Sequence, residues 1–548
     1  MNMKELFQLF KSVIDREWLE EHVVALTEIE RGQTFKSYAK AADYVHSLLL
    51  ENGFPSEKVR FPADGKTVYQ DKRMPLAWDA STGRITIKSS PIAFTDPVVA
   101  DFSKDAFALI KHSVATPTGG IVSRLVTEPQ VLAGEDCTGA MVLLEPTTPP
   151  RPPILKMVLD LGAMGIVSEF LTGGLDTPDS LQWVTACTEG NNWHVQSEDR
   201  EFIGFSVTPR VGQKLRQAVN TGEVSILVES DGRRYEGDLY GVTSLIPGKQ
   251  AKELWITAHL YEPLINDNSS GVIGAIEIVR QLRHMIDDGT LPPLEFSIRL
   301  VFAMEMYGFA AFADYFGGNL RGRAIGSINM DALPNGRDGS RFSVTLAPPA
   351  VPFFGNYLME DLVETYQKDF DNTSFQKISD GYCDDLFLSD STTGLPGIWP
   401  MSLGGKYWHN SIKNADFLDM DKFVTVEAFI AAWVTSTATL NTTTLPKVLK
   451  RAVALADRHL KDESIACQGR PGTDQRERMD YLLKIESERI ASFRQVGDIP
   501  EICQSINCLK MPKNILPVAL KGTSTPWFDY AATIIPSRVQ IGFPYDLI

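Results

Sequence analysis

The chain has 548 residues, which is too long for one compact core and predicts two to four domains. Its net charge of −16 argues against nucleic acid as the main partner, because binding to phosphates needs a basic surface. No apolar run approaches the ~18 residues that cross a bilayer, and the first residues lack the apolar stretch of a signal peptide. Six cysteines in so long a chain make no disulfide framework. We therefore expect a cytoplasmic protein with no membrane partner.

The N-terminal part, residues 1–114, is expected to begin the main domain with helices followed by short strands. Apolar residues recur at helical spacing within 3–53, and Asn52-Gly53 predicts the end of a helix. Residues 57–100 have the pattern of short strands and turns, as at 84–88.

A second domain is expected over residues 115–232. A buried strand at 139–146 is followed by a short helix at 153–161, and a helix at 210–220 leads into a strand at 223–229. This order resembles the protease-associated domain, a small β-rich insert that lies over the active site in several peptidase families. The alternative, an α/β insert of no special kind, stays open.

Strands and helices alternate in the next expected domain, 233–445. This alternation is typical of an α/β fold, with a mostly parallel or mixed sheet between layers of helices. Ligands bind such sheets at the carboxyl ends of the strands, where His259, Glu305 and Asp331 are expected. A C-terminal extension, 446–548, then contains two amphipathic helical patterns, at 447–460 and 474–496.

The segment 258–271 carries the most specific signal in the chain. It places His259 at the end of an apolar strand and Asp267 eight residues later, at the start of a helix. One short loop then aims an imidazole and a carboxylate at the same point, and zinc prefers this pairing of nitrogen and oxygen ligands. Each residue alone has an ordinary explanation, since a strand-end histidine is commonly structural and an aspartate commonly caps a helix. Their order and spacing together favour a metal site.

The chain resembles the zinc aminopeptidase and glutamate carboxypeptidase superfamily, and within it the bacterial leucyl aminopeptidases. It looks closer to a divergent aminopeptidase-like branch with a protease-associated insert. The motifs that carry the resemblance are Ala258-His259-Leu260, Asp267-Asn268-Ser269-Ser270-Gly271, Glu305-Met306-Tyr307-Gly308, Ile328-Asn329-Met330-Asp331 and Tyr407-Trp408-His409. The resemblance implies that the metal ligands are His259, Asp267, Asp331 and His409, and that the general base is Glu305.

Two positions depart from the family pattern. Met306 replaces a glutamate that binds the second metal, and Tyr261 replaces the aspartate that orients the first histidine. The first site keeps three protein ligands, the open arrangement of catalytic zinc, whereas the second keeps only Asp267 and His409. The resemblance therefore implies one zinc ion per chain.

The candidate substrate pocket is formed by four residues near these motifs. These residues are Glu262, Met306, Asp380 and Tyr407. Glu262 could also replace the orienting carboxylate that is missing at Tyr261. Of the other histidines, those in helical patterns are expected at the surface and two have no assigned role: His22, His46, His284 and His459 in the first group, His112 and His194 in the second.

The function expected from these residues is metal-dependent hydrolysis of an amide bond by an aminopeptidase-like enzyme. The expected partner is a small peptide or peptide-like metabolite, and whether the chain forms a homo-oligomer stays open. Two alternatives share the scaffold. One is zinc-dependent acyl transfer, as in the cyclisation of N-terminal glutamine, and the other is a non-catalytic binding protein, which the replaced ligand favours.

Overall fold

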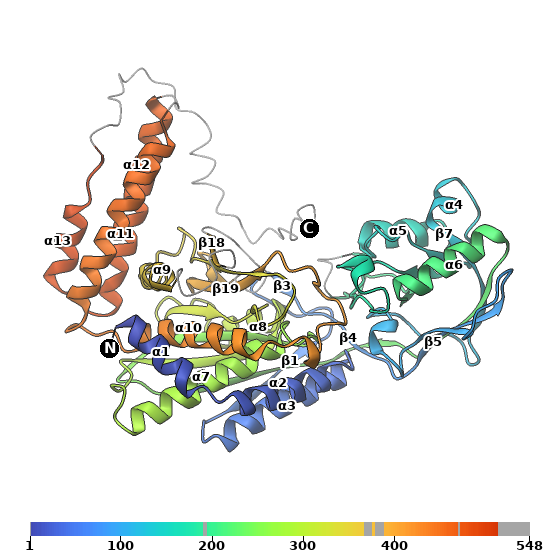
Figure 1. Ribbon diagram of the computed structural model, residues 1–548, viewed down its shortest axis with the longest axis horizontal. Coiled ribbons are helices and arrows are strands. Elements are labelled where there is room, and N and C mark those ends of the chain that lie inside the picture. The colour runs from blue at the N-terminus through green and yellow to red at the C-terminus, as the bar shows by residue number, and fades with distance from the viewer. Residues whose placement is uncertain (1, 190–193, 367–374, 379–387, 469–471, 513–548) are drawn as a thin grey trace.

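The main body of the protein is built on a large mixed sheet, seen in the computed structural model (Figure 1). This model describes residues 2–189, 194–366, 375–378, 388–468 and 472–512. Within them the main sheet has eight strands. Their order across the sheet is β1 (Glu57–Ala63), β13 (Gly237–Ile246), β15 (Phe296–Met304), β14 (Gln250–Leu260), β16 (Ala324–Asn329), β19 (Gly397–Leu403), β17 (Arg341–Thr345) and β18 (Phe375–Ile378).

The centre of this sheet is parallel and completely buried. β14 pairs in parallel with β15 on one side and with β16 on the other, and its residues 253–260 are all buried. A strand covered on both faces needs apolar side chains throughout rather than alternation, which explains the continuous run at 254–258. The two pairings bring the carboxyl ends of three neighbouring strands to one edge.

Helices cover both faces of the main sheet, as the sequence predicted. α8 packs through Phe312 against Gly241 of β13 and through Phe316 against Trp255 of β14. The helices labelled α2, α3 and α7 lie together along one side of the sheet in Figure 1. The helices of this body are α1 (Met3–Val13), α2 (Arg16–Glu30), α3 (Phe35–Glu51), α7 (Ser269–Asp287), α8 (Tyr307–Tyr315), α9 (Gly355–Tyr366), α10 (Met420–Ala438) and the 3-10 helix η4 (Ala415–Phe417).

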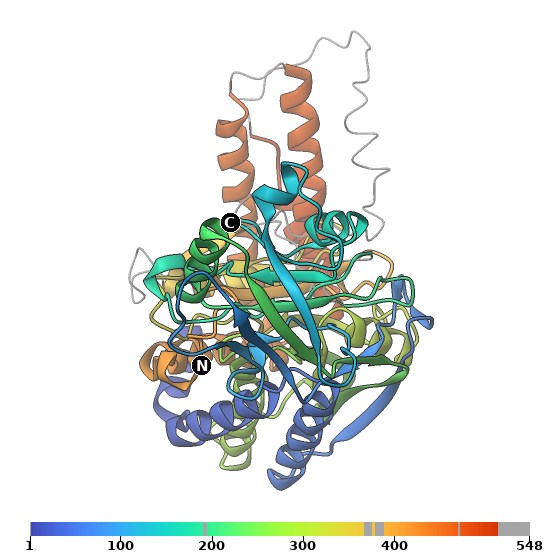
Figure 2. The same ribbon diagram turned by 90° about the vertical axis from the view of Figure 1, so that its right-hand side faces the viewer.

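A second sheet lies at one end of the molecule (Figures 1 and 2). Its order is β10 (Ile203–Ser206), β9 (Gly165–Ser168), β8 (Met141–Leu143), β7 (Ile121–Thr127), β11 (Ser225–Ser230), β5 (Gly83–Ser89) and β6 (Val98–Asp101). The helices α4 (Glu128–Leu132), α5 (Pro152–Asp160), α6 (Pro209–Thr221), η1 (Ala106–Ala108) and η2 (Gly174–Asp176) accompany it. We call residues 83–232 the insert.

The insert begins earlier than the expected boundary at residue 115. β5 and β6 precede that boundary, yet β5 pairs with β11 near the end of the insert. The chain enters and leaves through a paired stem, since β4 (Ala77–Asp79) is antiparallel to β12 (Arg233–Tyr235). A further small pair joins β2 (Val68–Tyr69) to β3 (Lys72–Arg73). The likeness of the insert to a protease-associated domain stays a prediction.

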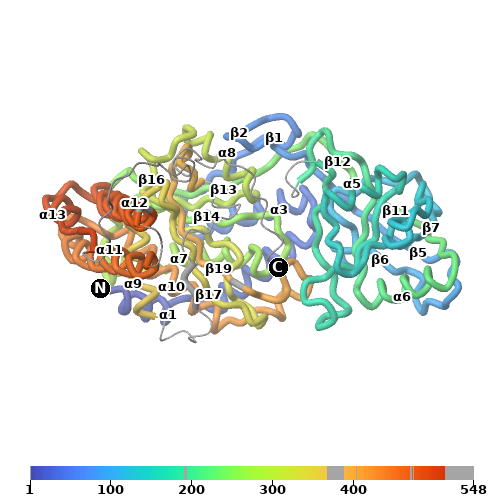
Figure 3. Tube along the Cα trace, turned by 90° about the horizontal axis from the view of Figure 1, so that it is seen from above, coloured from blue at the N-terminus to red at the C-terminus, as the bar shows by residue number. Residues whose placement is uncertain are grey.

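The C-terminal extension is helical and lies at the opposite end from the insert (Figure 3). It contains α11 (Leu445–Ala466), α12 (Gly472–Ala491), η5 (Ser492–Gln495) and α13 (Pro500–Cys508). α11 covers the predicted pattern at 447–460 and extends beyond both of its ends, whereas α12 begins two residues before the pattern at 474–496 and ends at Ala491, where η5 follows. No helix in the described part of the chain is both long and apolar enough to cross a membrane.

Candidate metal centre

The predicted ligands meet at the carboxyl edge of the parallel strands. His259 lies near the end of β14, and Met304, the partner of Leu260 in register, directly precedes Glu305. On the other side Thr257 pairs with Asn329, and His259 and Asp331 each come two residues after this pair. Strand register therefore places these side chains at one edge of the sheet, as expected from the sequence.

A first group of donors consists of His259, Asp267 and Asp331, all buried. The His259 Nε2 atom lies 2.9 Å from Asp331 Oδ1 and 3.1 Å from Asp267 Oδ1. Asp267 is not the N-cap of α7, because Asn268 occupies that position. Its carboxylate is thus not used to cap the helix.

A second group of donors consists of Glu262, Asp267 and His409, and it shares Asp267 with the first. The His409 Nε2 atom lies 3.0 Å from Glu262 Oε2 and 3.3 Å from Asp267 Oδ2. The two oxygens of Asp267 therefore face two different imidazoles. The sequence placed Glu262 in the substrate pocket, but in the structure its carboxylate joins Asp267 and His409. The second group therefore has three donors, although Met306 cannot supply one.

The spacing and chemistry of both groups fit a zinc ion. Ligand atoms about 2.1 Å from a tetrahedral ion are separated from each other by roughly 3.4 Å, close to the separations seen here. In both groups one imidazole nitrogen faces two carboxylate oxygens, although it carries at most one proton to share between them. A cation between nitrogen and oxygens satisfies all three atoms, and zinc takes this mixture of nitrogen and oxygen ligands.

The charges within this cluster depend on one another. Burial raises the pKa of Asp267, but hydrogen bonds from His259 and His409 outweigh it and leave the pKa well below its usual value. Burial also raises the pKa values of Asp331 and of Glu262, the latter with help from the charge of Asp267. For His409, burial lowers the pKa, yet the charge of Glu262 and the contact with Asp267 raise it overall. The three buried acids of this cluster therefore carry more negative charge than the two imidazoles can offset, and this excess favours the binding of a cation.

Backbone strain is concentrated around the same edge. Tyr261, Met306, Ala332 and His409 have positive φ angles of 84°, 54°, 48° and 54°. Such angles cost a non-glycine residue of order 1–3 kcal/mol and cluster at functional sites. Each of these residues is a ligand or is directly next to Glu262, Glu305 or Asp331. The surrounding packing therefore holds His409 and the chain neighbours of Glu262, Glu305 and Asp331 in unfavourable backbone conformations.

Glu30 is a buried acid of this region that the sequence did not reveal. It lies at the end of α2 and is 3% exposed. Its Oε1 atom accepts a hydrogen bond of 2.7 Å from the Tyr261 amide, and its Oε2 atom accepts one of 3.4 Å from Ser269 Oγ. Burial raises its pKa to about 8. No local pattern marks it, because its partners lie more than 200 positions away in the chain.

The remaining predicted residues lie at varying positions. Met306 is buried and precedes α8. The Tyr407 ring packs on Phe417 and against Gly173 of the insert, and Asp380 lies outside the described residues. Tyr261, which replaces the orienting aspartate, packs its ring against Phe35 and Tyr38.

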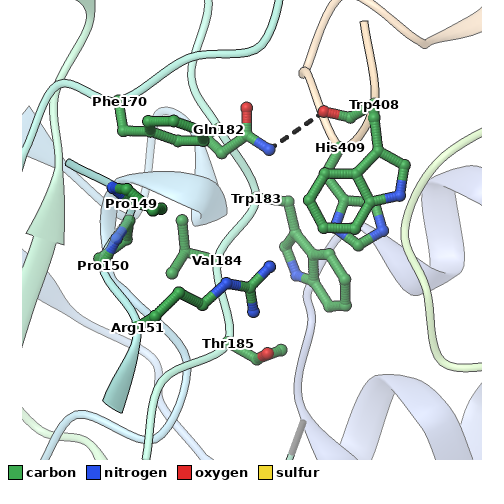
Figure 4. Close-up of a pocket in the computed structure, with 10 residues that line it drawn as sticks. All are labelled: Pro149, Pro150, Arg151, Phe170, Gln182, Trp183, Val184, Thr185, Trp408 and His409. Carbon is green, nitrogen blue, oxygen red and sulfur yellow. Dashed lines mark hydrogen bonds between the residues drawn. The ribbon is translucent and has the colours of Figure 1, made fainter. Parts of the chain in front are cut away.

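The insert holds the segment that carries His409. The Trp183 amide donates to the His409 carbonyl at 2.8 Å, and Gln182 Nε2 donates to the Trp408 carbonyl at 3.0 Å, the contact drawn in Figure 4. Asn410 Nδ2 donates in return to the Thr172 carbonyl at 2.8 Å. The His409 ring lies between two indoles, stacked on Trp408 and edge-on to Trp183. The second donor group therefore depends on the insert for its geometry.

Comparisons with known proteins found similarity in structure but not in sequence. No family model matches the chain, and no curated protein matches it. A Peptidase M28 precursor from Shewanella amazonensis has a similar structure, with a TM-score of 0.58 and 16% identity over 80% of this chain and 96% of the other. A putative peptidase from Clostridium acetobutylicum has a TM-score of 0.55 and 15% identity over 90% and 99%.

A third solved structure carries zinc in its name. It is BSAP, a zinc aminopeptidase from Bacillus subtilis, with a TM-score of 0.54 and 15% identity over 78% of this chain and 96% of that one. Identities this low establish the fold rather than the activity. The α/β fold that the sequence predicted is thereby confirmed, and the chain shares its fold with these solved peptidase structures.

Proposed function

We propose that this protein is a zinc-dependent hydrolase of the aminopeptidase kind, which cleaves an amide bond in small peptides or peptide-like metabolites. One observation carries the proposal: two groups of buried His, Asp and Glu donors share Asp267 at the carboxyl edge of the parallel strands. The zinc aminopeptidase fold supports it further.

We further propose that the chain binds two zinc ions, where the sequence alone implied one. His259, Asp267 and Asp331 would hold one ion, and Glu262, Asp267 and His409 would hold the other. Bound zinc supplies Lewis acidity, which polarises a scissile carbonyl and makes water more acidic. Glu262 compensates for Met306, because it brings a carboxylate to His409 from the β14 side of the site.

Glu305 is the proposed general base. It follows β15, which pairs with the strand that carries His259. Its negative charge raises the pKa of the buried Lys111, so the two side chains lie close enough to interact. Its carboxylate would take a proton from the attacking water and pass it to the nitrogen of the leaving amine. Proton transfer by a placed carboxylate contributes about 10²–10⁴-fold to the rate.

The test is Glu305→Gln, assayed on a panel of aminoacyl anilides and dipeptides. We expect kcat to fall by about 10²–10⁴-fold while zinc content stays unchanged, because Glu305 is in neither donor group. Glu295→Gln is the matched control, since Glu295 lies just before the opposite end of the same strand. It should retain both activity and zinc.

Two outcomes would contradict this assignment. Loss of zinc from Glu305→Gln would make Glu305 a ligand rather than a base. A zinc-loaded wild type that hydrolyses nothing on the panel would contradict the hydrolase itself. Product analysis on a glutaminyl peptide would then distinguish cyclisation, which releases ammonia without cleaving the chain, from a protein that only binds.

A further inference from the structure

The insert brings a buried lysine to the edge of the metal centre. Lys111 follows η1 and is bridged through its backbone to Thr185. It is completely buried, and among the described residues its Nζ atom has no hydrogen-bond partner. The Nζ atom lies 3.4 Å from the centre of the Tyr261 ring and 5.3 Å from that of Trp183. A buried amine without an acceptor is rare in proteins and points to a group that is supplied from outside.

The rings beside Lys111 also carry unused polar atoms. Trp183 Nε1 and the Tyr261 hydroxyl are buried without a hydrogen-bond partner in the described parts of the chain. Both rings neighbour a proposed ligand, because Tyr261 precedes Glu262 and Trp183 packs on His409. The indole can only donate a hydrogen bond, and the lysine side chain has no acceptor when charged. An incoming group that accepts hydrogen bonds would give the Trp183 N–H and the Lys111 amine a partner.

Arg151 is a second basic residue of the insert, and it lies near the Trp408 indole. The Arg151 guanidinium is 5.7 Å from the centre of the Trp408 ring. It lines a small pocket together with Gln182, Trp183, Trp408 and His409. Figure 4 shows its side chain extending beside the Trp183 indole. Lys111 and Arg151 thus both lie near Trp183, each on an aromatic ring adjacent to a proposed metal ligand.

Two basic side chains of the insert, Lys111 and Arg151, lie in acidic surroundings. The chain carries a net charge of −16, and Glu30, Glu262 and Glu305 all act on Lys111. Burial lowers the pKa of Lys111 well below its usual value, and these carboxylates raise it in part. A further anion next to Nζ would favour the ammonium form in the same way. Because the Lys111 Nζ atom is buried without a partner in the described residues and Arg151 lies over the ring next to His409, the two side chains fit an anionic group of planar shape, such as a carboxylate.

We propose that Lys111, Arg151 and the Trp183 N–H form a subsite for a carboxylate of the substrate. The inference rests on the proposed function and narrows its substrate class. The enzyme would prefer peptide-like substrates with an acidic side chain next to the scissile bond. Because all three residues belong to the insert, the insert would determine specificity as well as hold His409.

The kinetic test uses pairs of probes that differ only in charge. They are the 4-nitroanilides of glutamate and glutamine, and the peptide amides Ala-Glu-NH2 and Ala-Gln-NH2. In at least one pair we expect kcat/KM to favour the acidic member by about tenfold or more in the wild type. Lys111→Met should reduce this ratio to near one. Arg151→Met should reduce it as well, and it serves as the second variant because it is less buried and less apt to disturb folding.

Lys214→Met is the matched control, because Lys214 also lies over an aromatic ring of the insert, that of Phe94. It should keep the wild-type ratio. A ratio near one in the wild type for both pairs, or a ratio that both Lys111→Met and Arg151→Met leave unchanged, would overturn the proposal.

A binding measurement separates this proposal from the proposed function. Calorimetry on zinc-loaded Glu305→Gln protein compares the affinities of Ala-Glu-NH2 and Ala-Gln-NH2 without turnover. Tighter binding of the acidic peptide, lost on adding Lys111→Met, would support the subsite even if the wild type hydrolyses neither peptide. Equal binding of the two peptides would overturn the subsite even if hydrolysis is found.

Discussion

Glu30 connects a distant helix to the loop that carries the metal donors. Its carboxylate accepts from the Tyr261 amide, two residues after His259, and from Ser269 at the start of α7. Tyr261 comes directly after the last residue of β14, and its buried N–H needs an acceptor. Glu30 supplies that acceptor and holds the strand end in place.

Replacing Glu30 tests this contact. Glu30→Ala leaves a buried amide without an acceptor, which costs about 1–3 kcal/mol of unfolding free energy. Glu30→Gln should cost less, because its amide oxygen can still accept the bond. Urea denaturation of the metal-free protein measures both. Equal losses in the two variants would contradict the role of the acceptor.

The sequence identified the donors that lie in recognisable motifs, but it misassigned Glu262 and did not reveal the buried residues that reach the site from remote segments. His259, Asp267, Asp331 and His409 are recognisable because local pattern and motif mark them. Glu262 was assigned to the substrate pocket, since sequence spacing does not show which way a loop side chain turns. Glu30 and Lys111 reach the site from remote segments, and no short-range pattern reveals such a contact.

At the scale of elements, His459 links three helices of the C-terminal half. It lies on α11, and its Nε2 atom is 2.7 Å from Glu360 of α9 while its Nδ1 atom is 3.1 Å from Glu486 of α12. Tyr357 also donates a hydrogen bond to Glu486. The helical pattern of α11 placed His459 at the surface, but α9 and α12 cover it, which the pattern of a single helix cannot show.

This contact predicts that the C-terminal helices are destabilised at high pH. Burial lowers the pKa of His459, but hydrogen bonds to Glu360 and Glu486 raise it overall from its ordinary value of 6.5 to about 9. A raised histidine pKa stabilises the fold fully below pH 6.5, and the contribution is lost as the pH rises through 9. Its upper bound is on the order of 3 kcal/mol.

Hydrogen exchange of α11 and α12 at pH 6.5 and pH 9.5 measures the effect, after correction for the intrinsic pH dependence of exchange. Protection should fall at pH 9.5 in the wild type and change less in His459→Gln. The exposed His284 provides the control variant, His284→Gln. The same loss of protection in His459→Gln as in the wild type would contradict the assignment to His459.

For the whole molecule, the alternation of strands and helices was sufficient to predict the main sheet and its helical layers. The extent of the insert was not predictable, because β5 joins its sheet by pairing with β11, more than 120 positions later in the chain, and β6 joins it by pairing with β5. Pairing between distant strands depends on the fold as a whole. The same is true of the contacts through which the insert holds His409.

The most direct test of the account is the zinc content per chain of protein purified without chelator. The wild type should hold about two zinc ions, and His259→Ala and Glu262→Ala should each lose at least one, since each removes a donor from a different group. His284→Ala should match the wild type. About one ion, lost in His259→Ala but kept in Glu262→Ala, would contradict the second donor group. No tightly bound zinc in the wild type, even after zinc is added, would contradict the metal centre itself.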